Sequence, residues 1–492
     1  MTTGAHPDET VVGLEVHTEL RTVTKLFCGC PNRFGDAPNT NVCPVCLGLP
    51  GSLPVLNRQA VELAMAIGAA LGCEVRPSSF HRKNYFYPDM PKDYQISQYD
   101  EPINVNGRLA LPDGTVVGIE RAHLEEDTGK STHVGSSGRI HGADRSLVDY
   151  NRAGVPLVEI VSAPDLRSAA GARAYVAELR GILVATGASD GRMEEGSLRI
   201  DANVSVRAAG GPLGTRCEIK NLNSLRSLQR AVEFEAERQS QLLAEGGTVV
   251  QETRHWDENA GSTVTMRSKE EAYDYRYFPE PDLLPLAPDD AWRDRVAAAL
   301  PPMPAARRAA LLALLDDPAT SQGDQVASVV DLDLDRFVTT ATSRGVPASL
   351  AVARVANELA AIEGAGDLDA DKVATLLELE DRGELSATQA KAVLADLAAT
   401  GEDPRELARR RGYERLEVGA LDALLDELIA QHPSEWARYV EGDERLSQFF
   451  VGLVMRATSG KADGKAVVAG LAARRSTWSE GLGDLGAQRR PD

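Results

Sequence analysis

The 492-residue sequence predicts two parts, a mixed α and β fold up to about Leu286 and an all-helical second half. In the first part, stretches of alternating apolar and polar residues are typical of strands, whereas the second is rich in Ala, Leu, Glu and Arg at helical spacing. The run PEPDLLPLAPDD lies between them and suits a connector, because its prolines cannot continue a helix.

Length, charge and hydropathy limit the class of protein. A chain of 492 residues is long for one core, and typical domain sizes predict ~3 domains. The hydrophobic share of 43% is that of a globular protein, and no apolar run has the length of a membrane span. The start, MTTGAHPDETVV, lacks the features of a secretion signal, so we expect a cytoplasmic protein without membrane contact. The net charge of -20 argues against a nonspecific nucleic-acid coat but is compatible with a local basic site.

The first strand signal is VGLEVHTEL, in which apolar and polar residues alternate. Val12, Leu14 and Val16 are predicted on one face of the strand, and Glu15 and His17 on the other. Neighbouring side chains on one face of a strand lie ~7 Å apart, so Glu15 and His17 are spaced to converge on one ion.

Further carboxylates follow in two later segments. HLEEDTGKST supplies Glu125, Glu126 and Asp127, and VPLVEIVS places Glu159 in an otherwise apolar strand. Oxygen-rich sites favour magnesium, which commonly bridges substrate phosphates. The alternative for a single strand of this kind is a solvated polar face, and the pattern alone leaves both open.

Four of the six cysteines form a cysteine cluster within CGCPNRFGDAPNTNVCPVC: Cys28, Cys30, Cys43 and Cys46. In a reducing compartment the C-x-C and C-x-x-C spacing predicts metal ligation rather than disulfides. Four thiolates around a tetrahedral zinc make a closed structural site, because a catalytic zinc keeps a position open for water or substrate. The alternative is four reduced thiols without a metal. Cys73 and Cys217 stand alone and are expected to be packing residues.

Of two short motifs that resemble functional sites, the first is rejected and the second is given little weight. TGKST resembles the end of a phosphate-binding P-loop, but Leu124 stands where the motif needs Gly, and three acids precede it where phosphate would lie. VGSSGR is similar to the nucleophile loop of amidases, yet it lacks the flanking glycines and an obvious partnering base. It lies in a hydrophilic segment, where we expect a flexible loop.

The rest of the first half combines charged and aromatic residues. In SLRIDANVSVR, an alternating strand is predicted to turn Arg199, Asp201 and Asn203 outward. CEIKNLNSLRSLQRAVEFEAERQ changes to helical spacing, which puts Lys220 near a helix start as a candidate phosphate ligand. RKNYFYPDMPKDYQISQYD and RSKEEAYDYRYFPEPDL are rich in Tyr, Arg and Lys and suit a polar cleft or an interface.

The second half carries helix signals and a further break. In SATQ, Ser386 and Gln389 fit a capping box ahead of the apolar Ala390, Val393 and Leu394. GEDPRELARRRGYE predicts a second boundary, and the final STWSEGLGDLGAQRRPD is expected to be a frayed tail.

Taken together, these stretches resemble the B subunits of the bacterial aspartyl/glutamyl-tRNA amidotransferases. The motifs occur in the order of that family: VGLEVHTEL, NVCPVCLGLPGSLPVLN, RKNYFYPDMPKDYQISQ, HLEEDTGKS, NRAGVPLVEIVS, LRIDANVSVR, EIKNLNS, DYRYFPEPDL and FFVGLVMRATSGKADGKAVV. The resemblance implies an α+β fold class with three domains. These are a cradle-like catalytic domain over 1–292, a helical domain over 293–402, and a small helical tail domain over 403–492 that binds tRNA.

The resemblance also implies a reaction and partners. ATP phosphorylates the side-chain carboxylate of Glu on tRNA(Gln), or of Asp on tRNA(Asn), and ammonia displaces the phosphate. Because the chain lacks a credible glutaminase site, ammonia must come from a partner, which in the family is an amidase-type A subunit, with a small C subunit joining the assembly. The implied cofactors are ATP and magnesium (Mg²⁺). The cysteine spacing adds a structural zinc (Zn²⁺), and the occurrence of these cysteines in only some family members fits a structural rather than a catalytic role.

The resemblance assigns roles to individual residues. The implied magnesium-binding and catalytic positions are Glu15, His17, Glu125, Glu126 and Glu159. The implied passage for ammonia is lined by Lys83, Tyr85 and Lys92. Charge and motif position alone point to nucleotide contacts by Arg152, Lys220, Arg267 and Lys269.

Two segments depart from the family pattern, and two other functions compete with it. VGSSGRIHGADRS, over 134–146, is insertion-like, and GKADGK stands where relatives usually carry GKANP. A zinc-containing RNA-binding scaffold without catalysis is disfavoured by the acidic strand face. A free-standing ligase that uses ammonia directly would have to be active without partners. Which tRNA is used physiologically depends on the synthetases of the cell.

Overall fold

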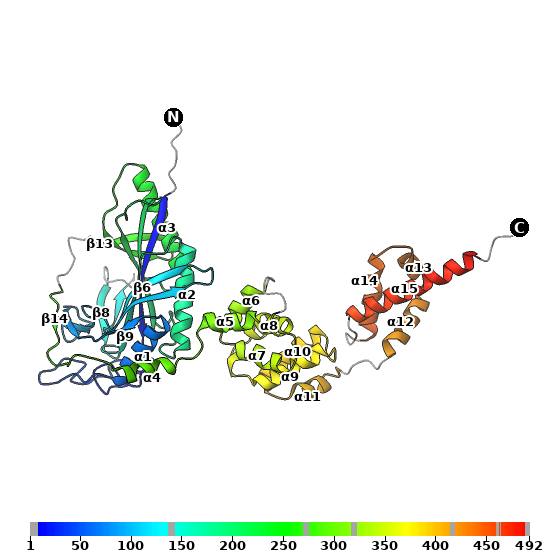
Figure 1. Cartoon of the computed structure of the whole chain (residues 1–492), viewed down its shortest axis with the longest axis horizontal. Helices are drawn as coiled ribbons and strands as arrows, with labels where there is room; N and C mark the ends of the chain where they lie inside the picture. Colours follow the sequence, from blue (N-terminus) through cyan, green and yellow to red (C-terminus); the bar gives the residue numbers. More distant parts are fainter. Residues whose placement is uncertain are drawn as a thin grey trace. The chain divides into compact units, whose positions relative to one another are not determined.

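The computed structural model describes residues 8–135, 143–268, 275–315, 322–413, 419–458, 462 and 464–487. The chain forms two compact units, Met1–Ala305 and Ala306–Asp492 (Figure 1). The predicted boundary at 292 lies inside helix α4 (Asp290–Ala298). This helix belongs to the first unit, because Trp292 Nε1 donates a hydrogen bond to Glu62 Oε1 at 3.0 Å and Arg293 Nη1 donates to the Val75 carbonyl at 3.0 Å.

A mixed sheet forms the centre of the first unit. Its strands are β1 (Asp8–Glu19), β2 (Glu74–Val75), β3 (His81–Asn84), β4 (Tyr94–Ser97), β5 (Asn104–Ala110), β6 (Val116–Glu126), β9 (Pro156–Ser162), β10 (Leu198–Ala208), β11 (Cys217–Lys220), β12 (Glu252–Asp257), β13 (Ser262–Ser268) and β14 (Phe278–Pro279). Their order across the sheet is β13-β12-β11-β10-β1-β9-β6-β4-β3-β14, with β5 beside β6 and β2 beside β5. The pairs are antiparallel except β11 with β12. Strand β1 therefore lies inside the sheet, between β9 and β10.

The alternation of β1 divides the two faces of the sheet as the sequence predicts. Val12, Leu14 and Val16 are buried in the apolar core, whereas Glu15 and His17 are half-buried on the opposite face. Because side chains alternate along a strand, neighbouring strands in register extend this division across the sheet. One face carries the core, and the other is polar.

Three helices cover the core face of the sheet (Figure 1): α1 (Arg58–Ala70), α2 (Ala169–Ala185) and α3 (Leu225–Ala244). Each begins at a polar residue whose side chain accepts hydrogen bonds from the first turn, namely Asn57, Ser168 and Ser224. The same helices bury small and apolar residues, such as Ala64, Ala172 and Leu228, against the sheet. The polar face is thus left for a site.

Strands β7 (Lys130–Gly135) and β8 (Ala143–Asp149) form a separate antiparallel pair. The insertion-like segment 134–146 is therefore partly strand at both ends, where the sequence predicts a loop. Residues 136–142, with most of the VGSSGR motif, lie outside the described residues. Lys130 and Ser131 of TGKST lie in β7 and do not begin a helix, which agrees with the rejection of a P-loop.

The second unit is helical and contains two apolar cores. The first core is formed by α5 (Pro304–Leu312), α6 (Gly323–Asp331), α7 (Asp335–Ser343), α8 (Ala348–Asn357), α9 (Ala370–Asp381), α10 (Ala387–Thr400) and α11 (Pro404–Arg410), with short 3₁₀ turns at Leu359–Ala361 and Ala365–Asp367. The capping box of Ser386 and Gln389 is present at the start of α10, and Val393 is fully buried. The predicted boundary at 402 precedes α11, which belongs to this core because Leu407 is buried in it.

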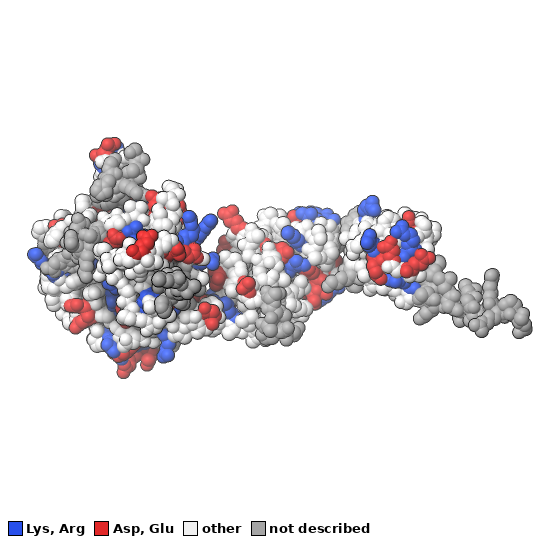
Figure 2. Space-filling model, turned by 90° about the horizontal axis from the view of Figure 1, so that it is seen from above, with Lys and Arg blue, Asp and Glu red and all other residues white. Residues whose placement is uncertain are grey.

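The second core comprises α12 (Ala420–Gln431), α13 (Pro433–Val440), α14 (Arg445–Ala457) and α15 (Gly464–Ala487) around Trp436 and Phe450. Helix α15 extends to Ala487, into the segment that the sequence predicts as frayed. Figure 2 shows acidic and basic side chains side by side on these helices, where Arg474 pairs with Asp422 and Asp426. No described helix is both long and apolar enough to span a bilayer.

Candidate active site and cysteine cluster

A cavity of about 610 Å³ lies on the polar face of the sheet. Side chains from β1, β3, β4, β6, β9, β10 and β11 line it, among them His17, Lys83, Gln95, Glu125, Glu159, Asp201 and Lys220. The antiparallel register brings these residues together, because His17 of β1 lies directly opposite Glu159 of β9, and Glu15 opposite Asp201 of β10. The cavity therefore collects charges from segments distant in the sequence.

His17, Glu125 and Glu159 form the first group of possible metal ligands. One ligand atom of each lies within 4.8 Å of the others, and His17 Nε2 lies 3.4 Å from Glu159 Oε2. Glu125 is buried and accepts a hydrogen bond from Ser97 Oγ at 2.8 Å. Glu159 is also approached by Arg121 Nη2 at 3.4 Å. These groups offer one ring nitrogen and carboxylate oxygens, a donor set that fits a divalent cation.

Both carboxylates of this group are ionised at neutral pH. Burial raises the pKa of Glu159, but the hydrogen bond from His17 and the charges of nearby cations outweigh it and hold the pKa well below its usual range. Burial likewise raises the pKa of Glu125, and contact with His123 more than offsets it, so that this pKa is lowered. For His17, burial lowers the pKa. The hydrogen bond to Glu159 raises it by a larger amount, so the net shift is upward.

Glu15 lies in a second acidic group and not beside His17. Its partners are Asp201 and Glu218, with ligand atoms within 4.8 Å of one another. Burial and the neighbouring carboxylates raise the pKa of Glu15, while Asn203 Nδ2 donates a hydrogen bond to it at 2.9 Å. Lys220 Nζ lies 2.5 Å from Asp201 Oδ2 and 2.8 Å from Glu218 Oε1, so two carboxylates already neutralise its charge.

Glu126 lies on the face of β6 opposite to Glu125. Because the two are consecutive in one strand, Glu126 shares the face of Leu124, which is in the apolar core. It is buried, forms an ion pair with Lys92, and accepts a hydrogen bond from the Ile96 amide at 2.9 Å. The five residues predicted for magnesium are therefore placed in three different surroundings.

Two of the three residues predicted for the ammonia passage line the cavity. Lys83 and Tyr85 do so, and Lys83 Nζ lies 4.7 Å above the Tyr275 ring. Lys92 instead lies beside a smaller cavity of about 50 Å³ next to the cysteine cluster. The structure thus places Lys83 and Lys92 beside two different cavities.

The predicted nucleotide contacts are dispersed. Arg152 donates hydrogen bonds to the carbonyls of Thr128 and Gly129 and lies 3.6 Å from Asp127, while Lys220 lines the large cavity. Arg267 lies in β13, in a part of that strand whose side chains are not described, and Lys269 lies outside the described residues.

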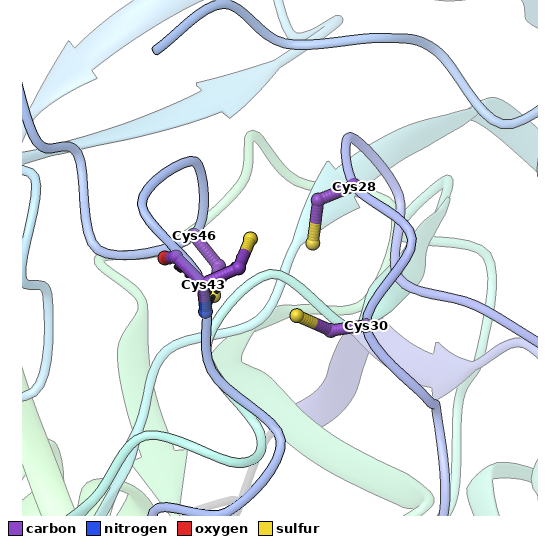
Figure 3. A group of neighbouring side chains, drawn as sticks. All are labelled: Cys28, Cys30, Cys43 and Cys46. Atoms are coloured by element: carbon purple, nitrogen blue, oxygen red, sulfur yellow. Dashed lines mark hydrogen bonds between the residues drawn. The ribbon is translucent and has the colours of Figure 1, made fainter.

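The four cysteines converge as the sequence predicts (Figure 3). The sulfur atoms of Cys28 and Cys30 point toward the loop that carries Cys43 and Cys46, and all four lie within 4.8 Å of one another. The hydrogen bond between Cys28 and Cys46 lowers the pKa of the Cys46 thiol to about 5 and raises that of the Cys28 thiol. Since Zn–S bonds of about 2.3 Å in a tetrahedron separate the sulfurs by about 3.8 Å, the cluster fits a zinc ion.

Sequence reasoning missed several residues that line the cavity or contact its acidic groups. His123 is fully buried, with Nε2 3.2 Å from Glu125 Oε1, and Gln95 Nε2 donates to Glu125 Oε2 at 3.2 Å. His123 stands two positions before Glu125, so the alternation of β6 places both on one face and offered a signal for it. Glu218 had no such signal, because its place depends on the pairing of β11 with β10.

The model of the GatB/GatE catalytic domain matches residues 10–294, and that of the GatB domain matches residues 337–474. The B subunit of the aspartyl/glutamyl-tRNA(Asn/Gln) amidotransferase of Moorella thermoacetica is 49% identical over 466 residues, covering 92% of this chain and 97% of that protein. The protein of the same name from Frankia casuarinae is 50% identical over 479 residues, covering 93% and 94%. That of Salinispora arenicola is 48% identical over 484 residues, covering 93% and 95%. This chain therefore belongs to the family of aspartyl/glutamyl-tRNA(Asn/Gln) amidotransferase B subunits, which are amidotransferases of the ligase class.

Proposed function

We propose that this chain activates the side-chain carboxylate of Glu on tRNA(Gln) or Asp on tRNA(Asn) with ATP and then amidates it with ammonia, for use in protein synthesis in the cytoplasm. The observation that carries the proposal is the convergence of His17, Glu125 and Glu159 in a cavity of about 610 Å³ within the segment that matches the catalytic-domain model. The names of the relatives state the two aminoacyl-tRNAs.

The reaction has two steps. The first converts a carboxylate oxygen, which is a poor leaving group, into a phosphate, and the second displaces that phosphate with ammonia. In the first, a carboxylate oxygen of the aminoacyl side chain attacks the γ-phosphorus of ATP, and the bond to the bridging oxygen breaks to release ADP. In the second, the nitrogen of ammonia attacks the acyl carbon, the bond to the phosphate oxygen breaks, inorganic phosphate leaves, and the nitrogen loses a proton. Phosphate is a far better leaving group than the oxide that direct attack would require.

In this proposal His17, Glu125 and Glu159 hold the magnesium ion, and that ion supplies neutralisation of charge on the transferring phosphoryl group. Their ionised state supports the assignment, because a cation site of this kind needs carboxylates that stay charged while buried. In the same proposal, Glu15 belongs to the magnesium-binding site as a member of the second acidic group, whose other residues lie on the neighbouring strands.

The basic residues of the cavity are assigned to the substrates. Lys83 and Tyr85, which line the large cavity, are assigned to the delivery of ammonia to the activated carboxyl group. Lys92, which pairs with Glu126 beside the smaller cavity next to the cysteine cluster, is assigned to the same passage. Lys220, Arg152, Arg267 and Lys269 remain the proposed nucleotide contacts, with Lys220 supported by its place in the large cavity. The cysteine cluster holds a structural zinc, because four thiolates leave no position for substrate.

The word subunit in the relatives' names implies a complex of several chains. We assign the release of ammonia from glutamine to an amidase-type A subunit, and the joining of the assembly to a small C subunit. The tail helices α12 to α15 are assigned to tRNA binding. The competing scaffold function has no use for buried ionised carboxylates in a cavity, and the proposed enzyme does.

The test is Glu125→Ala in the reconstituted complex. Amidation of misacylated tRNA should fall by about 10²–10³-fold, with glutamine or with ammonium as nitrogen donor, because the lost step precedes attack by ammonia. Glu237→Ala, which alters an exposed carboxylate of α3, is the control and should keep the wild-type rate. Wild-type amidation by Glu125→Ala, or its rescue by ammonium, would refute the assignment. Lys83→Met should instead impair glutamine-dependent more than ammonium-dependent amidation.

A further inference from the structure

The loop that follows the cysteine cluster lies directly against Lys92. Gly48 stands two residues after Cys46, in a turn closed by its amide bonding to the Val45 carbonyl at 3.0 Å. A Cβ added at Gly48 would lie 2.5 Å from Lys92 Cγ and 3.0 Å from Lys92 Cα. Rotation of the lysine side chain relieves the contact with Cγ but not the contact with Cα. That contact is tighter than most Cβ contacts, so one of the two backbone segments must shift by a few tenths of an ångström.

Lys92 lies in a turn between β3 and β4, and the next residue, Asp93, has a φ of 63°. Its ammonium group lies 5.1 Å from the centre of the Tyr94 ring and 5.8 Å from that of the Phe27 ring. The same group forms a buried ion pair with Glu126, and both side chains are less than a tenth exposed. A buried ion pair is stable only if its geometry is held, since a displaced partner leaves the other charge unpaired. The backbone of Gly48 packs against Lys92 and limits how far the lysine can move from Glu126.

The cysteine cluster and the ion pair share one small cavity. This cavity has a volume of about 50 Å³, and its lining includes Cys28, Cys46, Gly48, Lys92 and Glu126. A space of that size has room for one or two water-sized molecules and none for a rearranged lysine chain. A shift of the loop that carries Cys43 and Cys46 would therefore be transmitted to the ion pair.

We propose that Gly48 is a positioning residue: the metal-bound cysteine cluster holds its backbone against Lys92 and so fixes the Lys92–Glu126 pair. The cysteine cluster then acts on the ammonia passage, which gives a structural metal site a defined effect on nitrogen delivery. This inference rests on the proposed function, in which Lys92 lies on that passage.

Gly48→Ala tests the contact in the full complex. The Ile96 amide, which donates to Glu126 Oε1, serves as a reporter that needs no catalysis. We expect its hydrogen exchange to become about tenfold faster when Glu126 is displaced. We also expect the ratio of glutamine-dependent to ammonium-dependent amidation to fall about tenfold, because only the first uses the passage.

Gly51→Ala is the matched control. Gly51 lies in the same loop and also has a positive φ, of 85°, but a Cβ there would meet no atom within 4 Å. It carries the backbone strain of the substitution without the contact. Unchanged Ile96 exchange in Gly48→Ala, or equal acceleration in Gly51→Ala, would overturn the proposal.

Removal of zinc by a chelator from the wild-type complex is the second measurement. It tests the proposal even if the Gly48→Ala variant does not fold. Ile96 exchange should accelerate to a similar degree, and an unchanged rate would overturn the role of the cysteine cluster. Failure of the wild-type complex to amidate tRNA with ammonium would refute the proposed function. The exchange of Ile96 would still decide whether Gly48 and the metal position the pair.

Discussion

The two units of the chain differ in where they keep their charged side chains. In the first unit, Lys25, Glu125, Glu126, Asp127 and Glu159 are buried. Among the described residues of 306–492, no Asp, Glu, Lys, Arg or His is buried, and ion pairs such as Arg411 with Asp396 lie on helix surfaces. Burying a charge costs free energy unless a partner compensates it, so a fold retains buried charges where something other than stability requires them.

The two units differ in what orders their structure. The sheet of the first unit holds ionised groups in fixed register, which suits phosphoryl transfer and the delivery of a nucleophile. The helical unit obtains its order from apolar cores and helix caps and leaves its charges for solvent and partners. The same division should appear when each unit is perturbed separately.

The largest expected effect is loss of the cysteine cluster. Cys43→Ser should remove zinc and lower the free energy of unfolding of the first unit by on the order of 4 kcal/mol, while the unfolding transition of the helical unit stays in place. Elemental analysis and scanning calorimetry measure the two. Cys73→Ser, outside the cluster, is the control and should retain zinc. A native wild-type protein without zinc, or a Cys43→Ser variant of unchanged stability, would contradict this division.

An intermediate effect is expected from removing the tail. Truncation after Tyr413 deletes α12 to α15 but keeps α11, whose Leu407 is buried in the preceding core. The KM for tRNA should rise about tenfold while kcat at saturating tRNA is retained, since the buried charges all remain. An unchanged KM would show that the tail makes no contribution to tRNA binding.

The smallest effect is expected from a single helix cap. Ser386→Ala removes the capping box of α10 and should lower the free energy of unfolding of the helical unit by about 1 kcal/mol, with amidation unchanged. Chemical denaturation followed by circular dichroism measures it. Ser343→Ala, which removes an exposed hydroxyl at the end of α7, should change the free energy of unfolding by less than about 0.5 kcal/mol. Equal effects of the two would argue that caps do not order this unit.

Features that depend on neighbouring residues could be predicted from the sequence, whereas the pairing of distant strands could not. The alternation of VGLEVHTEL placed Glu15 and His17 on one face, and SATQ marked the start of α10, because both signals depend only on neighbouring residues. The spacing of the cysteines was informative for the same reason.

What the sequence could not provide was the register between distant strands. That register puts Glu15 with Asp201 and Glu218, and His17 with Glu159, although Glu15 and His17 are sequence neighbours. The ends of domains were also beyond local patterns. Helix α4 has ordinary helical composition, and its attachment to the first unit depends on tertiary contacts, among them those with Glu62 and Val75 and the packing of Trp292 on the core.

The central place of β1 has a consequence for synthesis on the ribosome. Its residue Glu15 is bonded by Asn203, which lies 188 residues later in the chain. At the usual rate of translation, about 10–40 s pass before that partner emerges. Until β9 emerges, both edges of β1 have no strand to pair with, and the edge that pairs with β10 stays open for the whole interval. Exposed strand edges are sites of aggregation. The charges of Glu15 and Glu19 then hinder association of one nascent chain with another, before either takes part in chemistry.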